Sequence, residues 1–561
     1  MRILIVGGVA AGMSAAARAR RHDENAEIIV LERGPEVSFA NCGLPYHVGG
    51  EIPHEGSLLL HTPETLKAAL NLDVRTGHDV TALDTAAKTI TVASASGVEE
   101  MTYDALILAP GAAAVRPPLP GLDSPRVRTL RTVSDAVTLK KWVDDGATRG
   151  VVLGAGFIGL EAAEALRHRG LEVDVVELAP HVLPPLEKEM ATVVTTQLRN
   201  LGIRVHAGVA AEAVEVSAEA DTVILSDGTR IETDLVVLSV GVRPDTAFIQ
   251  DAGVETIRGA IVVDDHGRTS AEGVWAAGDA VISTDAVTGV QRPVPLAGPA
   301  NRAGRLIADD IFGMAGARTI PQPIGTAIVR VGEITAAMTG ANRQSLDAAG
   351  IAYTTLHLHP MQHAGYFPGA ATVHLMVHIA DEDGRVLGAQ AVGYEGIDKR
   401  IDVLATAIRA GLVAEDLMDL DLAYSPPYGQ AKDPVNLVGM VAENVRNGRL
   451  AMWYAQDLEQ VQSESLLLDV RTRREFASGH IPGSINIPHT ELRERIDEVT
   501  EAAAGRPVAT ICASGVRTNI AARVLVDHGF ETAALSGGMT TFRQWWGDAT
   551  ADILVKERVT A

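Results

Sequence analysis

The most reactive side chains of this 561-residue chain are two cysteines, Cys42 and Cys512, far apart in the sequence. A secreted protein stapled by disulfides would use more cysteines, so we expect a reducing compartment, the cytoplasm, and two free thiols. Cys42 stands in the segment SFANCGLPY, and Gly43-Leu44-Pro45 predicts the start of a helix. A thiol at a helix N-terminus has a lowered pKa and reacts as a thiolate. The alternative is a buried, inert cysteine.

Cys42 has no nearby cysteine with which to form a redox disulfide. Disulfide reductases with a C-x-x-x-x-C pair need their second cysteine at the position occupied here by His47. The sequence therefore predicts a single redox thiol that works with an external sulfur partner.

The second cysteine begins the segment CASGVR, residues 512–517, directly after the apolar run VATI. Small residues allow successive backbone N–H groups to converge into an anion-binding nest, and Arg517 adds positive charge. Such a loop would stabilise a thiolate or a persulfide at Cys512. A phosphatase loop is the competing interpretation. Phosphatases surround the phosphate with a longer Cys–Arg loop, so sulfur transfer is favoured.

Residues 2–32 and 149–177 repeat one pattern: an apolar strand, a glycine-rich turn, an alanine-rich helix, a second apolar strand and a final Glu. Each is a βαβ unit, and the pair predicts two dinucleotide sites, although one unit could lack a ligand. In the first turn, GGVAAG, Val9 replaces the middle glycine of G-x-G-x-x-G, and Gly8 could supply the lost freedom. The residues predicted to bind the first nucleotide are Gly7, Gly8, Ala11, Gly12, Glu32 and Arg33.

The glycine turn of the second unit, GAGFIG, is complete, with Gly154, Gly156 and Gly159 between a strand and a helix. Glu32 and Glu177 each end the second strand of their unit, where a carboxylate accepts hydrogen bonds from ribose hydroxyls. Glu177 would repel a 2′-phosphate and no Arg follows it directly, so we predict NADH rather than NADPH. The alternative is a solvated Glu177 that selects neither cofactor.

The composition suits a soluble globular protein, with 47% hydrophobic residues, 21% charged residues and a net charge of −23. This acidic balance argues against binding to nucleic acid or to anionic membranes. No stretch of about 20 residues is apolar enough for a membrane span. The apolar run after Arg2 superficially resembles a secretory signal, but a strand, a turn and a helix explain it better. His357, His359 and His363 lack a cysteine or carboxylate that would complete a metal site, so no metal is predicted.

Three elements resemble the FAD-binding elements of the flavoprotein disulfide reductases with two dinucleotide sites. They are the first glycine turn, LAPG at residues 108–111 and AGD at residues 277–279. The resemblance implies that Asp279 contacts the ribityl chain of FAD, whereas the residues alone also allow an Asx turn there. The further residues predicted to bind cofactors are Ala109, Gly111, Gly241, Asp279 and Ala297.

SFANC closely resembles the SFxNC motif of coenzyme A-disulfide reductases and their relatives, the NADH-dependent persulfide reductases and NADH oxidases. The resemblance covers nearly all of residues 1–446. It implies that Cys42 is the nucleophile and holds a mixed disulfide with coenzyme A. Arg18 and Arg21 lie three positions apart and could clamp its phosphates, or could form a solvated basic face. The residues that match coenzyme A contacts of the family are Ser14, Arg18, Arg21, Ser38 and Asn41.

Two tyrosines match family positions that assist proton transfer near the thiol: Tyr366 in HAGYFPGA and Tyr424 in AYSPPYGQAK. Tyrosine is a weak acid and can protonate a leaving thiolate, whereas the alternative is a packing role. Many relatives have a second tyrosine where Phe367 stands. In the family, the segment around Tyr424 and Lys432 reaches the active site of the partner subunit, which implies a homodimer and a substrate contact for Lys432.

The segment LDVRTRREFASGHIPGSINIP resembles the first half of rhodanese domains, with Asp469, Arg471, Glu475, His480 and Gly483 in place. Together the resemblances imply an α/β protein with two Rossmann-like dinucleotide-binding domains, an α+β dimerisation domain and a C-terminal rhodanese-like α/β domain. The predicted segments are FAD-binding 1–115 and 246–320, NAD-binding 116–245, dimerisation 321–446, linker 447–462 and rhodanese-like 463–561.

The predicted activity is the NADH-dependent, FAD-mediated reduction of coenzyme A persulfide, polysulfide or coenzyme A disulfide. Cys42 would be freed from a mixed disulfide by reduced FAD and would attack the substrate. Tyr366 and Tyr424 would protonate the leaving sulfur, and Cys512 would handle sulfane sulfur. The rhodanese fusion favours a persulfide over a symmetrical disulfide. Two alternatives stay open: a water-forming NADH oxidase that cycles Cys42 through sulfenic acid, and a non-enzymatic sulfur-carrier or redox-sensing protein.

Overall fold

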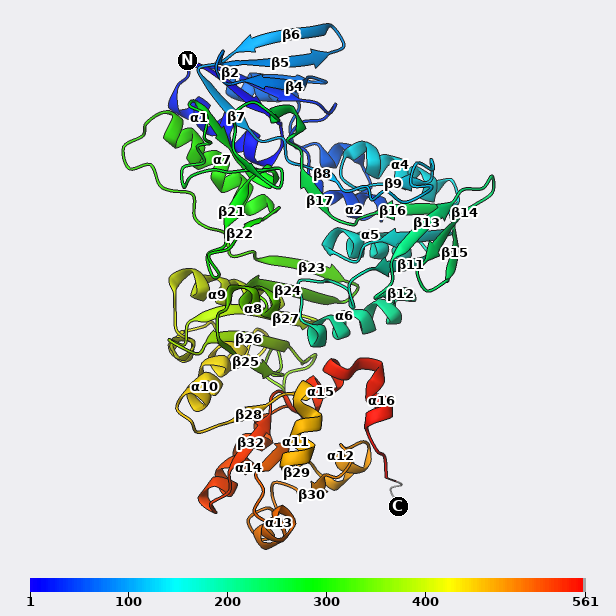
Figure 1. Ribbon diagram of the computed structural model, residues 1–561, viewed down its shortest axis with the longest axis vertical. Coiled ribbons are helices and arrows are strands. Elements are labelled where there is room, and N and C mark those ends of the chain that lie inside the picture. The colour runs from blue at the N-terminus through cyan, green and yellow to red at the C-terminus, as the bar shows by residue number, and fades with distance from the viewer. Residues whose placement is uncertain (558–561) are drawn as a thin grey trace. The chain divides into compact units, whose positions relative to one another are not determined.

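The computed structural model describes residues 1–557 (Figure 1). The chain forms two units, and each is described here by itself. The first comprises Met1–Pro180 and Leu201–Gly325, and the second comprises His181–Asn200 and Thr326–Ala561. Within residues 1–557, no helix combines the length and apolarity needed to cross a lipid bilayer.

The first sheet of the first unit is parallel throughout, in the order β20-β7-β1-β2-β3. The sequence RILIV of β1 is buried from Ile3 to Val6, as expected for a parallel strand covered on both faces. The strands are β1 (Arg2–Val6), β2 (Glu27–Glu32), β3 (Asp73–Thr76), β7 (Ala105–Leu108) and β20 (Val274–Ala276).

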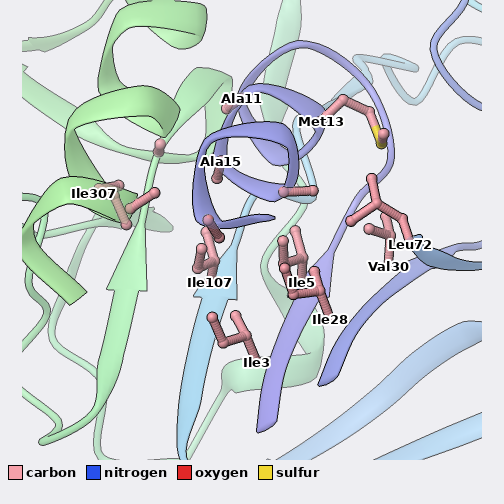
Figure 2. Close-up of a cluster of buried hydrophobic side chains, with 14 of the residues drawn as sticks. Ile3, Ile5, Ala11, Met13, Ala15, Ile28, Val30, Leu72, Ile107 and Ile307 are labelled. Carbon is pink, nitrogen blue, oxygen red and sulfur yellow. The ribbon is translucent and has the colours of Figure 1, made fainter. Parts of the chain in front are cut away.

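Helices α1 (Ala10–His22) and α7 (Ala297–Ile311) pack against one face of this sheet. The two helices approach closely, because a Cβ at Gly304 would lie 2.1 Å from the carbonyl oxygen of Ala11. The other face packs against an antiparallel sheet of β4 (Asp79–Asp84), β5 (Thr89–Ser94) and β6 (Gly97–Thr102). Figure 2 shows the helix-side core, with Ile3, Ile5 and Ile107 from the strands and Ala11, Ala15 and Ile307 from the helices.

The second sheet of the first unit repeats this architecture in the parallel order β12-β11-β10-β16-β9. Its core continues into an antiparallel sheet of β13 (Ala211–Glu215), β14 (Asp221–Leu225) and β15 (Arg230–Thr233). The repetition confirms the two predicted Rossmann-like domains. The strands are β9 (Val127–Arg128), β10 (Arg149–Leu153), β11 (Glu172–Glu177), β12 (Ile203–Ala207) and β16 (Leu235–Leu238).

Short elements complete the first unit. Strands β8 and β17 form an antiparallel pair that joins Ala112 to Pro244. The helices are α2 (Leu44–Val48), α3 (Pro63–Leu70), α4 (Val133–Asp144) and α5 (Phe157–His168). The strands are β8 (Ala112–Ala114), β17 (Val242–Pro244), β18 (Thr256–Ile257), β19 (Ala260–Ile261), β21 (Ile282–Thr284) and β22 (Gln291–Pro293).

The second unit begins with an antiparallel sheet in the order β23-β24-β27-β26-β25. Helices α9 (Ile397–Ala410) and α10 (Pro434–Arg446) pack on it through one apolar cluster. Helices α6 (Lys188–Asn200) and α8 (Arg343–Ala349) belong to the same unit. The strands are β23 (Ala327–Val331), β24 (Ile334–Gly340), β25 (Tyr353–Leu358), β26 (His374–Ala380) and β27 (Val386–Gly393).

The C-terminal part has a parallel sheet in the order β28-β32-β31-β29-β30, which confirms the predicted α/β domain. Strand β28 (Met452–Trp453) lies inside residues 447–462, the segment predicted as a linker. The domain boundaries given in the sequence analysis remain predictions. The other elements are α11 (Leu458–Glu464), β29 (Leu466–Asp469), α12 (Arg473–Ala477), β30 (Ile485–Asn486), α13 (Ile496–Ala503), β31 (Val508–Ile511), α14 (Val516–Asp527), β32 (Thr532–Leu535), α15 (Gly538–Trp546) and α16 (Thr550–Ile553).

Candidate dinucleotide and thiol sites

The first glycine turn joins β1 to α1. Gly7 has φ of +98°, and a Cβ there would lie 2.0 Å from the carbonyl oxygen of Ala109, so this position requires glycine. A Cβ at Gly12 would lie 2.0 Å from the carbonyl oxygen of Gly7. Val9 is tolerated at the middle position because its φ is −115°. No side chain caps the N-terminus of α1, so its first N–H groups suit a phosphate.

The carboxylates at the ends of β2 and β11 have the same geometry in the two dinucleotide units. Glu32 accepts hydrogen bonds at 2.8 Å from the N–H of Gly8 and, also at 2.8 Å, from the N–H two positions after Glu32. Glu177 accepts 2.7 Å and 2.8 Å hydrogen bonds from the N–H of Ala155 and from the N–H two positions after Glu177. Both side chains are thus held beside their glycine turns, where the ribose of a bound dinucleotide lies.

A cavity of about 330 Å³ lies beside the first glycine turn and has the polar lining that a nucleotide needs. Arg33 and Asp245 form an ion pair in its wall. Burial alone would lower the pKa of Arg33, but Asp245 raises it overall. The cavity is lined by Val6, Gly7, Leu31, Glu32, Arg33, His78, Asp79, Val80, Thr81, Pro110, Asp245, Ala247 and Phe248.

Asp279 and Gly111, both predicted to bind FAD, converge on Arg131. The guanidinium of Arg131 lies 3.4 Å from the carboxylate of Asp279, and a Cβ at Gly111 would lie 3.5 Å from the same guanidinium. The sequence analysis missed Arg131, because its segment LRT carries no motif. Gly241 has φ of +105°, and Ala297 is the first residue of α7.

The second glycine turn is built like the first. Gly154 has φ of +98°, and a Cβ there would lie 2.3 Å from the carbonyl oxygen of Ser239. A Cβ at Gly159 would lie 2.0 Å from the carbonyl oxygen of Gly154. Gly156 precedes α5, and a Cβ there would meet nothing within 4 Å. The middle glycine therefore leaves open space at a helix N-terminus, where a pyrophosphate can approach the backbone.

Cys42 is exposed and lies in the 3-10 turn η1 (Asn41–Gly43), directly before α2. The segment is tied to the first glycine turn, because the N–H of Ser38 donates a 2.8 Å hydrogen bond to the carbonyl oxygen of Gly8. The segment that carries the thiol predicted to be redox-active is thus anchored to the first glycine turn.

The expected lowering of the Cys42 pKa is wrong. Partial desolvation by neighbouring atoms raises the pKa of this thiol, and the carboxylate of Glu161 raises it further. Helix α2 has only five residues, so its dipole is a weak counterweight. Glu161 is the fifth residue of α5 and accepts a 3.0 Å hydrogen bond from the hydroxyl of Tyr46. Glu161 was missed because only the fold brings it near Cys42.

The substitution Glu161→Gln is expected to lower the pKa of Cys42, because an amide carries no negative charge to oppose the thiolate. The rate of alkylation by iodoacetamide, measured against pH in a Cys512→Ser background, should reach half of its maximum at a lower pH. An unchanged profile would show that Glu161 does not govern this thiol.

Of the two arginines predicted to clamp coenzyme A phosphates, Arg18 already forms an ion pair within the protein. Arg18 lies 2.5 Å from the carboxylate of Asp309, so its charge is already compensated. Ser14 donates a 2.6 Å hydrogen bond to Asn301 of α7. Arg21 is exposed, so the predicted phosphate clamp depends chiefly on Arg21.

Tyr366 and Tyr424, which are 58 positions apart, meet in the second unit with their hydroxyls 3.2 Å apart. The two loops are also joined by a 2.9 Å hydrogen bond from the N–H of Ala364 to the carbonyl oxygen of Gly429. The hydrogen bond with Tyr424 raises the pKa of Tyr366, so this phenol stays protonated at neutral pH. The pair can therefore supply a proton.

Several large apolar side chains remain exposed on the loops around this pair. Tyr366 and Tyr428 are 77% and 74% exposed. Clusters of this kind on otherwise polar surfaces mark contact sites. The exposed members between residues 361 and 428 are Met361, Tyr366, Phe367, Tyr394, Tyr424 and Tyr428.

Cys512 follows β31 and is buried, with 1% of its surface exposed. The N–H of Gly515 donates a 3.1 Å hydrogen bond to its sulfur, and the thiol lies 3.7 Å from the hydroxyl of Thr518. Gly515 has φ of +95°, a left-handed conformation that favours glycine at the N-cap of α14. The loop thus offers a donor to a sulfur anion at the N-terminus of α14.

Arg517 does not contribute the uncompensated positive charge that the sequence suggested. Its guanidinium forms 2.7 Å and 2.8 Å hydrogen bonds with the two carboxylate oxygens of Glu475. Arg517 lowers the pKa of Glu475 to about 2, so the ion pair persists at all physiological pH values. Arg517 therefore fixes the loop after Cys512 against α12.

Two of the three clustered histidines form hydrogen bonds with other side chains of the protein. His357 bonds to Glu189 at 2.9 Å and to Ser536 at 2.8 Å, and His359 bonds to Thr541 at 2.7 Å. Across residues 1–557, no group of three or more His, Cys, Asp or Glu side chains is placed to hold a metal ion.

The free energy of unfolding of the second unit is expected to fall when the pH drops below about 6.5. Burial lowers the pKa of four histidines, so the folded chain keeps them neutral where the unfolded chain binds protons. Each of these histidines lowers the free energy of unfolding by up to about 1.4 kcal/mol for every pH unit between its unfolded and folded pKa values.

Urea unfolding from pH 7 to 4 measures this dependence of stability on pH. The substitution His374→Gln removes a group with a pKa of about 4 and should reduce the dependence. A flat profile would contradict the assignment. The histidines are His357, His359, His374 and His378.

Comparison with protein families agrees with this geometry. The model of the pyridine nucleotide-disulphide oxidoreductases matches residues 1–304, and the model of their dimerisation domain matches residues 326–434. The chain belongs to this oxidoreductase family. A rhodanese-like domain matches residues 451–544 of the oxidoreductase. The cofactors of the oxidoreductase are FAD and NADH. The two glycine turns, the cavity and the carboxylates of Glu32 and Glu177 fit these cofactors.

Curated relatives of the oxidoreductase include a coenzyme A disulfide reductase of Staphylococcus haemolyticus. The two are 34% identical over 452 residues, which is 79% of this chain and 100% of the relative. An NADH oxidase of Methanocaldococcus jannaschii is 33% identical over 440 residues, covering 78% of this chain and 97% of the relative.

Two solved structures match almost the whole oxidoreductase. Reduced CoADR-RHD of Bacillus anthracis is 38% identical, covers 99% of both chains and has a TM-score of 0.95. An NAD-dependent persulfide reductase from A. fulgidus is 37% identical, covers 97% of this chain and 100% of its own, and has a TM-score of 0.90.

Proposed function

We propose that this oxidoreductase uses NADH and FAD to reduce coenzyme A persulfide, polysulfide or coenzyme A disulfide. The observation that carries the proposal is the exposed Cys42, anchored to the FAD turn without a second cysteine in its segment. A lone thiol there must take its sulfur partner from the substrate. The names of the relatives support this substrate class, and the rhodanese-like domain favours persulfide. The relative named NADH oxidase keeps oxygen as the alternative acceptor.

The proposed chemistry takes place at the Cys42 sulfur. When bound, NADH and FAD together supply two electrons. The Cys42 thiolate attacks the inner sulfur of coenzyme A persulfide, forms a disulfide with coenzyme A and expels hydrosulfide. Two electrons then cleave that disulfide and regenerate the Cys42 thiolate and the coenzyme A thiolate. Two protons complete the products, coenzyme A thiol and hydrogen sulfide.

Tyr366 and Tyr424 are proposed to hold the proton for the leaving sulfur. Their loops carry the exposed aromatic side chains described above, which suit a contact with a second copy of the chain. The matched dimerisation domain supports a homodimer. In such a dimer, the tyrosine pair and Lys432 would serve the Cys42 of the other copy.

Cys512 is proposed to carry sulfane sulfur as a persulfide, stabilised by the N–H of Gly515 and positioned by Arg517. The residues proposed to bind coenzyme A or its persulfide are Ser14, Arg18, Arg21, Ser38, Asn41 and Lys432. The residues proposed to bind FAD and NADH are Gly7, Gly8, Ala11, Gly12, Glu32, Arg33, Ala109, Gly111, Gly154, Gly156, Gly159, Glu177, Gly241, Asp279 and Ala297.

The test is anaerobic NADH oxidation with coenzyme A persulfide, polysulfide or coenzyme A disulfide as the acceptor. With persulfide, one hydrogen sulfide should form for each NADH consumed. An oxygen electrode run without sulfur substrate examines the alternative. Rapid oxygen-dependent NADH oxidation together with no sulfide release would overturn the proposal.

A further inference from the structure

One buried cation binds both of the segments that carry the tyrosine pair. Arg400, on α9, has only 1% of its surface exposed. Its guanidinium donates hydrogen bonds of 2.8 Å and 3.3 Å to the two carboxylate oxygens of Asp433. It donates another of 2.8 Å to the carbonyl oxygen of Gln362. Gln362 precedes the Tyr366 loop, and Asp433 ends the Tyr424 loop.

The two loop residues that Arg400 binds, Gln362 and Asp433, are anchors of their loops. The side chain of Gln362 accepts a hydrogen bond from the N–H of Ala371 and donates one of 3.0 Å to the carbonyl oxygen of Gly369, which closes the Tyr366 loop. Asp433 accepts from the N–H of Val435 at 3.1 Å and so caps α10, where the Tyr424 loop ends.

The geometry calls for the planar fork of arginine. A fourth guanidinium hydrogen bond, 3.1 Å long, reaches the carbonyl oxygen of Gly396, so the same group spans three segments. A Cβ at Gly396 would lie 2.2 Å from the guanidinium, so that glycine makes room for it. Lysine carries one compact ammonium and cannot span such a set. Lys399, the neighbouring cation, lies 3.5 Å from Asp433 and is partly exposed.

We infer that Arg400 is a positioning residue, which holds the Tyr366 and Tyr424 loops in register so that the two hydroxyls meet beside the leaving sulfur. This inference rests on the proposed role of the tyrosines. The loops contain several glycines and prolines and expose their aromatic side chains, so the register of the pair depends on their anchored ends. A shift of about 1 Å in a reacting group can cost about 100-fold in rate.

The test compares the full-length holoenzyme with Arg400→Met/Asp433→Asn, which removes both buried charges and keeps an N-cap at α10. Stopped-flow absorbance measures flavin reduction by NADH, and a second mixing measures flavin reoxidation by coenzyme A persulfide. The variant should lose about 10- to 100-fold in reoxidation and keep its rate of flavin reduction. Arg400→Lys with Asp433 intact should recover only part of the loss. Adding Tyr366→Phe/Tyr424→Phe to the variant should cause little further loss.

Arg446→Met is the matched control, because Arg446 pairs with Glu415 in the same unit without binding either tyrosine loop. It should leave both half-reactions unchanged. Equal losses in both half-reactions, or a full additive loss with the tyrosine variants, would overturn the positioning role. If the double tyrosine variant itself reoxidises at the wild-type rate, the proposed function of the tyrosines fails instead. If only the arginine variant reoxidises normally, the inference fails alone.

Discussion

Replacing Cys42 with serine is expected to lower sulfur-dependent NADH oxidation by at least about 1,000-fold, as removal of a covalent nucleophile does in other enzymes. Cys42 is the exposed thiol, and its segment is hydrogen-bonded to the FAD turn. A serine hydroxyl cannot form or release a disulfide. Steady-state NADH absorbance with coenzyme A persulfide or coenzyme A disulfide measures the loss.

The matched control for this prediction is Cys512→Ser, which removes the other thiol. With preformed coenzyme A persulfide, Cys512→Ser should retain most of the wild-type rate, because the persulfide reaches Cys42 directly. Flavin reduction by NADH should persist in Cys42→Ser, which shows that the cofactor sites are intact. An unaltered sulfur-dependent rate in Cys42→Ser would refute the mechanism.

The substitution Glu177→Ala is expected to raise the KM for NADH by about 10- to 100-fold, the loss of about 1–3 kcal/mol expected when a charged hydrogen-bonding partner disappears. Glu177 is held by the N–H groups of Ala155 and Ala179, in position to bind ribose hydroxyls. The KM for NADPH should rise less or fall, because the carboxylate no longer repels the 2′-phosphate. Initial rates with both cofactors give the change in preference.

Two further variants complete this test: one removes only the charge of Glu177, and the other changes the equivalent carboxylate of the first dinucleotide unit. Glu177→Gln keeps the length of the side chain and removes its charge, so it should improve the use of NADPH relative to NADH. Glu32→Gln changes the equivalent carboxylate in the FAD unit and should weaken FAD retention without altering nicotinamide preference. Equal losses for NADH and NADPH in Glu177→Ala would show that Glu177 supports the loop and selects nothing.

Local sequence patterns predicted the parts of the fold whose chemistry is local. The turn between Gly154 and Gly159 and the carboxylate of Glu177 lie within one βαβ unit, so spacing alone determines how they meet. The turn from Cys512 to Gly515 is equally local, whereas the charge of Arg517 is compensated by the distant Glu475. Residue type was sufficient to predict these turns because a left-handed backbone favours glycine, and because the residue at a strand end lies beside the adjacent turn.

Contacts between distant segments could not be predicted in this way. Glu161 raises the pKa of Cys42 across more than 100 positions, and no periodicity reveals such a neighbour. Asp309 compensates Arg18 from another helix, so the expected free cation proved to be an ion pair. Tyr366 and Tyr424 could be paired only through a family resemblance, because the two loops have no common pattern.

The two thiols differ in accessibility, and this difference determines which reagents can reach each of them. The side chain of Cys512 is buried, with 1% of its surface exposed, whereas Cys42 is exposed, so a bulky reagent should reach Cys42 first. Selective labelling follows from the same difference: a large maleimide should tag Cys42 and leave Cys512 unmodified.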